Sequence, residues 1–134
     1  MSFVLDTNVV SALMKGDAKA LNWFEPKRRS DVWLPQPVVA ELHFGLASMP
    51  GSRRKTLFEE RFALLLQELP RVGWDDAVSR AFGRIKAQLE KKGQPLEDFD
   101  IAIAAHALAH DVVLATRDRR HMPRIVGLKW EVLA

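Results

Sequence analysis

A short apolar run that ends in a carboxylate constrains this chain most. Residues 3–5, Phe-Val-Leu, are followed at once by Asp6, Thr7 and Asn8. An apolar run of this kind is typical of a short buried strand. Open α/β sheets bind their ligands outside the carboxyl ends of their strands. The sequence therefore predicts a buried strand that delivers Asp6 to a functional sheet edge.

Further short apolar runs alternate with helical patterns along the chain. We expect strands at residues 3–5, 31–34, 71–74, 112–115 and 129–132. Helices are expected at 9–14, 18–24, 37–48, 53–69, 76–92 and 101–109, with Asp17, Ser52 and Asp75 as N-caps of three of them. This alternation predicts an α/β fold, a parallel sheet covered by helices on both faces, in one domain over residues 1–134.

Composition excludes several classes of protein. The chain has no cysteine, which rules out disulfides, zinc–thiolate sites and thiol catalysis and suits the reducing cytoplasm. No apolar run is long enough to span a bilayer, and the first residues lack the pattern of a signal peptide. The net charge is only +3, but basic residues cluster, as expected either of a solvated surface or of a surface that meets nucleic acid.

Three further acids occur at places comparable to that of Asp6. Glu41 lies one turn into the helix at 37–48, Asp100 precedes the apolar helix at 101–109, and Asp118 follows the strand at 112–115. Each has a simpler explanation taken singly: a turn or cap for Asp6 and Asp118, an exposed helix position for Glu41, and a favourable first-turn charge for Asp100. Glu97 and Asp98 are near Asp100, and we prefer Asp100 because it immediately precedes the apolar run.

The four acids together predict a cation site. In a right-handed parallel sheet all four can reach the same edge, where they would repel one another without a cation between them. A site with oxygen ligands alone suits Mg²⁺ or Mn²⁺. These ions also bind the phosphate of a substrate, so the site predicts phosphodiester chemistry. We expect such an ion to lower the pKa of an attacking water and to offset charge on the phosphate.

Four motifs in order resemble those of the PIN domains, and most of all the VapC and FitB-like toxins of bacterial toxin–antitoxin pairs. They are Val-Leu-Asp-Thr-Asn at 4–8, Glu-Leu-His-Phe-Gly at 41–45, Asp-Ile-Ala-Ile-Ala-Ala at 100–105 and Ala-Thr-Arg-Asp at 115–118. The resemblance implies a flavodoxin-like three-layer fold, a Mg²⁺- or Mn²⁺-dependent endoribonuclease that leaves 5′-phosphate and 3′-hydroxyl ends, a homodimer and a cognate antitoxin.

The resemblance also implies roles for individual residues. Asp6, Glu41, Asp100 and Asp118 match the catalytic acids of the family, and Asp6, Asp100 and Asp118 its metal ligands. Thr116 matches a supporting residue near the metal, and Thr7 and Asn8 are carried over as two further supporting residues.

Two other groups of residues have expected roles outside the acidic site. Arg117, Arg119 and Arg120 are expected to hold the RNA backbone rather than to read bases. The leucines of the helix at 53–69 exceed what one core face needs. They fit a place in the core, whereas an apolar surface left over after core packing would instead suit an antitoxin helix. The chain's histidines show no ligand-like spacing and receive no role; they are His43, His106, His110 and His121.

Two alternatives stay open on the sequence. A haloacid-dehalogenase-like phosphatase would use Asp6 as its nucleophile, but this chemistry needs a second Asp two residues on, where the chain has Asn8. A non-catalytic module that binds RNA or an antitoxin would be expected to lack one or more of the four acids, and all are present.

Overall fold

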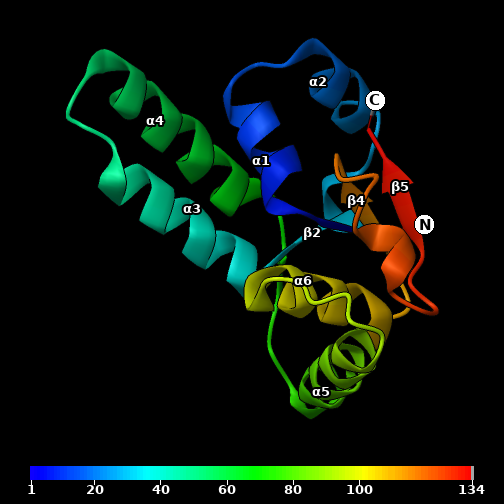
Figure 1. The fold of residues 1–134 in the computed structure, drawn as a ribbon. Coiled ribbons are helices and arrows are strands. Elements are labelled where there is room, and N and C mark those ends of the chain that lie inside the picture. The colour runs from blue at the N-terminus through cyan, green and yellow to red at the C-terminus, as the bar shows by residue number, and fades with distance from the viewer. Residues whose placement is uncertain (134) are drawn as a thin grey trace.

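Five parallel strands form the centre of the computed structural model, which describes residues 1–133 (Figure 1). Their order across the sheet is β3-β2-β1-β4-β5, and every neighbouring pair is parallel. The strands are β1 (Phe3–Leu5), β2 (Val32–Pro35), β3 (Arg71–Val72), β4 (Val113–Thr116) and β5 (Trp130–Val132). The predicted parallel α/β sheet is confirmed.

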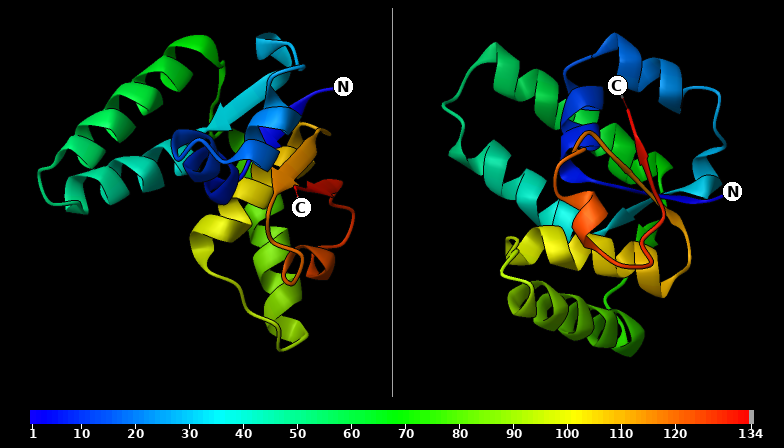
Figure 2. Two further views of the ribbon diagram at one scale, coloured as in Figure 1. Left: turned by 90° about the horizontal axis from the view of Figure 1, so that it is seen from above. Right: turned by 45° about the vertical axis from the view of Figure 1, so that its right-hand side comes forward.

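Six helices connect and cover these strands in three layers, with α1 and α2 on one side of the sheet and α5 and α6 on the other (Figures 1 and 2). α3 and α4 form an antiparallel pair that projects from the sheet. The helices are α1 (Thr7–Met14), α2 (Ala18–Phe24), α3 (Gln36–Ser48), α4 (Arg53–Glu68), α5 (Asp76–Lys91) and α6 (Asp98–Ala109), with 3₁₀ turns η1 (Arg29–Asp31) and η2 (Met122–Arg124).

The predicted helix starts are confirmed where a polar side chain caps the first turn. Asp17, Ser52 and Asp75 each accept a hydrogen bond from the backbone N–H three residues later, at 3.0–3.1 Å. These bonds satisfy N–H groups that the first turn of a helix leaves free. Pro37 lies in the first turn of α3, where its missing N–H costs nothing.

Most predicted boundaries agree with the structure to within one residue, but three were wrong by two residues or more. α1 begins at Thr7 rather than at residue 9. β3 ends at Val72 rather than at residue 74, because the exposed Trp74 has left the sheet and its indole N–H bonds to Ser79. α6 begins at Asp98 rather than at residue 101, so that Asp98 and Asp100 both lie in its first turn. The apolar run marks the buried part of this helix, whereas the helix itself extends further toward solvent.

The core lies between the sheet and the helices around it. Val4, Leu5, Leu34 and Leu114 on the central strands are completely buried, and α6 contributes the consecutive buried residues 101–107. A helix buried on every side matches its apolar sequence. Within the described residues, no helix is long and apolar enough to cross a membrane.

Gly45 has no close neighbour from another part of the fold. It is exposed on α3, and a Cβ built on it would meet no atom within 4 Å. Gly45 lines an open apolar groove between α1, α3 and α4 and does not pack against another helix.

Candidate active site

The candidate site lies where the sheet changes its direction of winding. The chain runs outward from β1 through β2 to β3, and then returns to place β4 on the other side of β1. Crevices outside the carboxyl ends of such strands are the usual ligand sites of open α/β sheets. Asp6 follows β1 and Thr116 ends β4, so these side chains meet at this point.

Asp6 is buried, with 6% of its surface exposed, and caps the N-terminus of α1. Its Oδ1 accepts a hydrogen bond from Thr7 N–H at 2.8 Å, and its Oδ2 accepts one from the Thr116 hydroxyl at 2.7 Å. Burial raises the pKa of Asp6 to about 6 although these hydrogen bonds oppose the rise, and the negative charges of Asp100 and Glu41 raise it further.

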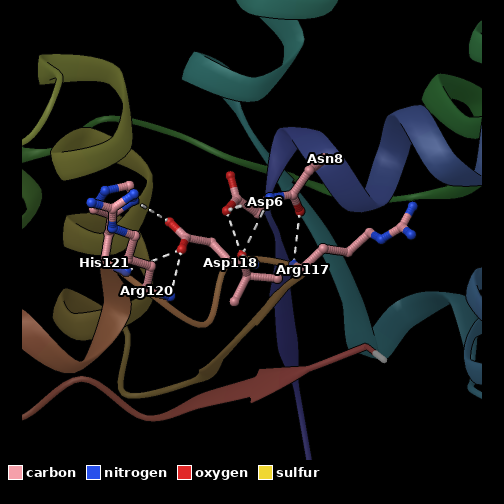
Figure 3. A network of polar contacts seen from close by, with 7 residues as sticks. Asp6, Asn8, Arg117, Asp118, Arg120 and His121 are labelled. Atoms are coloured by element: carbon pink, nitrogen blue, oxygen red, sulfur yellow. Dashed lines mark hydrogen bonds and ion pairs between the residues drawn. The ribbon is translucent and has the colours of Figure 1, made fainter.

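Asn8 joins the start of α1 to the loop after β4. Its Oδ1 accepts a hydrogen bond from Arg117 N–H at 3.0 Å, while its Nδ2 lies 3.5 Å from Asp6 Oδ2 and from Thr116 Oγ1 (Figure 3). Asn8 is therefore engaged in holding this loop beside Asp6.

Glu41 reaches the same region from α3. Its Oε1 accepts a hydrogen bond from the Thr7 hydroxyl at 2.6 Å, and its side chain is partly buried. Thr7 thus contacts two of the acids, Asp6 through its backbone N–H and Glu41 through its hydroxyl.

Asp98 and Asp100 both lie in the first turn of α6, but their surroundings differ. Asp100 is half-buried, and burial raises its pKa together with the negative charges of Glu41 and Asp118. Asp98 is exposed and forms an ion pair with Lys86 at 3.0 Å. The geometry therefore favours Asp100 as the member of the acidic cluster.

Asp118 is held by a tight turn after β4. Its Oδ1 accepts hydrogen bonds from Arg120 N–H at 2.9 Å and His121 N–H at 3.0 Å, and its own N–H donates to Thr116 Oγ1 (Figure 3). Burial alone would raise the pKa of Asp118, but the hydrogen bonds from the backbone and imidazole of His121 and from Arg120 N–H hold it below its usual value.

His121, for which the sequence predicts no role, contacts Asp118. Its Nδ1 lies 2.9 Å from Asp118 Oδ2. The available signal was local: an aspartate that caps a turn brings the residue three positions later against its carboxylate. Spacing between histidines could not detect this contact, because His121 pairs with an acid and not with another histidine.

Of the other histidines, His106 is buried, and within the described residues only one of its two ring nitrogens has a hydrogen-bond partner. Its Nδ1 bonds to the Ala102 carbonyl at 2.7 Å, and its Nε2 has no partner within the described residues. Burial holds the pKa of His106 below its usual value.

The arginines of the β4–η2 loop are exposed at the rim of the site. Arg117, Arg119 and Arg120 all face solvent. The Arg117 side chain extends away from Asp6 and Asp118 in Figure 3, and within residues 1–133 it forms no ion pair with either acid.

The acidic cluster offers the donor chemistry of a hard divalent cation. Within residues 1–133, neither Lys nor Arg forms an ion pair with Asp6, Glu41 or Asp100. In the same range, no three carboxylate or imidazole side chains converge closely enough to hold an ion as they stand. Burial and neighbouring carboxylates raise the pKa of Asp6 and of Asp100, so these oxygen donors fit a cation that would draw them together.

Comparisons with known proteins identify the family to which this chain is related. The PIN-domain family model matches residues 3–128. The VapC ribonuclease Y4jK of Sinorhizobium fredii is 39% identical over 123 residues, which cover 86% of each protein.

Two solved structures superpose over nearly the whole chain. VapBC2 of Rickettsia felis, bound to a DNA fragment from its promoter, matches with a TM-score of 0.89 at 24% identity over 100% of both chains. FitAcB of Neisseria gonorrhoeae matches with a TM-score of 0.84 at 26% identity, over 96% of this chain and 95% of the other. The chain belongs to the PIN-domain family and, within it, to the VapC ribonucleases.

Proposed function

We propose that this protein is a metal-dependent endoribonuclease that cuts RNA phosphodiester bonds and acts as the toxin of a toxin–antitoxin pair in the cytoplasm. The observation that carries the proposal is the buried Asp6 at the point where the sheet changes direction. Its pKa is raised to about 6, and Asp100 and Glu41 add negative charge beside it. A site that concentrates negative charge in this way is suited to a cation and to the phosphate groups that the cation attracts.

Asp6, Asp100 and Asp118 would hold Mg²⁺ or Mn²⁺ in the proposed enzyme. When bound, such an ion supplies Lewis-acid stabilisation of the phosphate and a water of lowered pKa. Glu41 contributes a carboxylate that the Thr7 hydroxyl keeps in one orientation, so that it can order a water molecule next to the phosphate. Thr116 and Asn8 fix Asp6 and the loop that carries Asp118.

Replacing Asp6 by Asn tests the proposed site. Asp6→Asn keeps the shape of the side chain and removes its charge, so we expect the purified variant to lose cleavage of labelled RNA in Mg²⁺ or Mn²⁺. EDTA should abolish cleavage by the parent. The matched control is Asp111→Asn, since Asp111 is exposed and its positive φ of 52° is one that Asn adopts readily.

The control should cut RNA at the parent's rate. Circular dichroism should show that both variants are folded. A folded Asp6→Asn protein that cuts as fast as the parent would remove Asp6 from the site.

An apolar groove beside Glu41 is the proposed binding site of the antitoxin. The groove, of about 320 Å³, lies between α1, α3 and α4. Apolar side chains dominate its lining, with Met14, Leu42, Leu46, Met49 and Phe58 among them. A groove of this character suits the apolar face of a partner helix, and such a partner would block access to the catalytic acids.

Gly45 offers a way to fill this groove without disturbing the fold. An added side chain meets open space there, so Gly45→Trp should weaken binding of the co-expressed antitoxin in a pull-down assay. Gly83→Trp on α5 is the matched control, because a Cβ at Gly83 also meets nothing within 4 Å and lies outside the groove. Equal antitoxin binding by both variants would place the partner elsewhere.

A further inference from the structure

Asp118 has three hydrogen-bond contacts of 2.9–3.0 Å. Backbone N–H groups of Arg120 and His121 bond to Oδ1, and the imidazole Nδ1 of His121 lies 2.9 Å from Oδ2. A carboxylate has about four acceptor positions. Three are therefore occupied, and Asp118 has one left for an ion or for a water molecule that an ion holds.

The imidazole is the only one of these donors that reaches Oδ2. Both backbone N–H groups bond to Oδ1. Without a partner for Oδ2, the carboxylate could therefore rotate about Oδ1. A carboxylate accepts hydrogen bonds and does not donate them when ionised, so Nδ1 must carry the proton. The imidazole thus fixes the plane of the carboxylate.

A purely structural role does not account for the imidazole. His121 precedes η2, but its side chain makes no capping hydrogen bond to that turn. The side chain is 36% exposed, so it is not a core residue. Its other surroundings belong to the site: His121 and Asp100 line the same polar hollow beside the start of α6.

We propose that His121 is a positioning residue, which holds Asp118 in the orientation that the divalent ion requires. The inference rests on the proposed function of the acidic site and adds a residue to it. Hydrogen-bonded partners of ligating carboxylates typically contribute roughly 10- to 100-fold to metal affinity or activity. His121 acts through Asp118 and makes no contact with the substrate in this role.

Substitutions at His121 separate positioning from general loop stability. His121→Ala removes the hydrogen-bond donor and the ring. His121→Phe also removes the donor but retains an aromatic ring. His121→Asn places an amide N–H near the position of Nδ1, whereas the longer His121→Gln places its amide nearer to that of Nε2. His110→Ala is the control, since His110 is exposed and ends α6 away from the acids.

Mn²⁺ binding to the RNA-free protein, measured by calorimetry, is the direct readout. We expect Kd to rise roughly 10-fold or more in the Ala, Phe and Gln variants, and to return toward the parent's value in His121→Asn. The melting temperature in EDTA should change little across the series. Cleavage by His121→Ala should need more Mn²⁺ but should approach the parent's rate at saturation.

Unchanged Mn²⁺ affinity in folded His121→Ala or His121→Phe would overturn the positioning role. The same holds if Asn and Gln weaken binding equally, because only Asn restores the donor near Nδ1. A parent protein that binds no Mn²⁺ would overturn the proposed metal-dependent function itself, and this inference with it.

Discussion

At the scale of single residues, burial of the Asp6 carboxyl group disfavours its charged form. Its pKa is about 6 in the folded protein and near 3.8 in an unfolded chain. Between these values the folded state binds more protons than the unfolded state, so stability falls as pH rises through this window. Below pH 3.8 Asp6 is protonated in both states and the penalty disappears.

Asp6→Asn should therefore stabilise the metal-free protein at neutral pH while it abolishes cleavage. A pKa that is about two units higher corresponds to a gain of up to about 3 kcal/mol above pH 6. Chemical denaturation of both proteins in EDTA, at several pH values, measures the difference. It should shrink as pH falls from 6 to 4, and a gain that is independent of pH would contradict the raised pKa.

Asp98 and Asp100 provide a second comparison of single residues. Asp100→Asn should reduce RNA cleavage strongly, because Asp100 lies within the electrostatic reach of Glu41 and Asp118. Asp98→Asn removes only an exposed ion pair with Lys86 and should leave cleavage nearly unchanged. Rates of cleavage at saturating Mg²⁺ decide this, and the reverse order would move the site to Asp98.

The sequence could predict Asp6 and Asp118 as site candidates because each follows an apolar strand. It favoured Asp100 over Asp98 because Asp100 precedes the apolar run, but it could not show that Asp98 also lies in the first turn of α6, since an apolar run does not mark where the exposed turn begins. His121 escaped prediction, since its role depends on a turn geometry that the residue types alone leave open.

At the scale of elements, the caps and the periodic patterns determined most helix boundaries. The N-caps Asp17, Ser52 and Asp75 were predictable because a polar side chain precedes a periodic apolar pattern. The end of β3 was not, because the hydrogen bond of Trp74 to Ser79 forms only in the folded protein. The surroundings of Gly45 could not be predicted either, since they depend on how α1, α3 and α4 pack.

Gly45 and Gly16 should respond in opposite ways to the same substitution. Gly45 is helical and a Cβ there meets open space, so Gly45→Ala should stabilise the fold by about 0.5–1 kcal/mol. Gly16 has a φ of +75°, which Ala adopts only with strain, so Gly16→Ala should destabilise it. Denaturant unfolding measures both, and a destabilised Gly45→Ala protein would contradict the open groove.

The β4–η2 loop should contribute its charges to RNA binding. Reversing Arg117, Arg119 and Arg120 to Glu should weaken RNA binding to the catalytically inactive Asp6→Asn protein and flatten its salt dependence. Reversing Arg84 and Lys91 on α5 together with its C-cap Lys92 changes the net charge equally and is the matched control. Equal losses in fluorescence titrations would mean that net charge, and not this loop, attracts RNA.

At the scale of the whole molecule, the acidic site should link metal binding to stability. An ion that binds the folded site and not the unfolded chain raises the melting temperature by mass action. The rise with Mg²⁺ or Mn²⁺ should shrink as pH falls, because protons compete for the carboxylates. Thermal melts at several metal concentrations and pH values test this expectation.

A variant with both Asp6→Asn and Asp118→Asn serves as the control for the metal effect. It should show almost no metal-dependent rise in melting temperature. If its melting temperature rises as much as the parent's, the stabilising ion binds elsewhere on the protein.

The hydrogen bond between Thr116 and Asp6 joins residues 110 positions apart, and it depends on β4 pairing with β1. During synthesis, a chain that has emerged only as far as α6 already carries Asp6, Glu41 and Asp100. It lacks the strand that places Thr116 beside Asp6 and the turn that holds Asp118. The proposed nuclease site is therefore among the last parts of the protein to form, and prematurely terminated chains that end before β4 should be harmless to the cell that makes them.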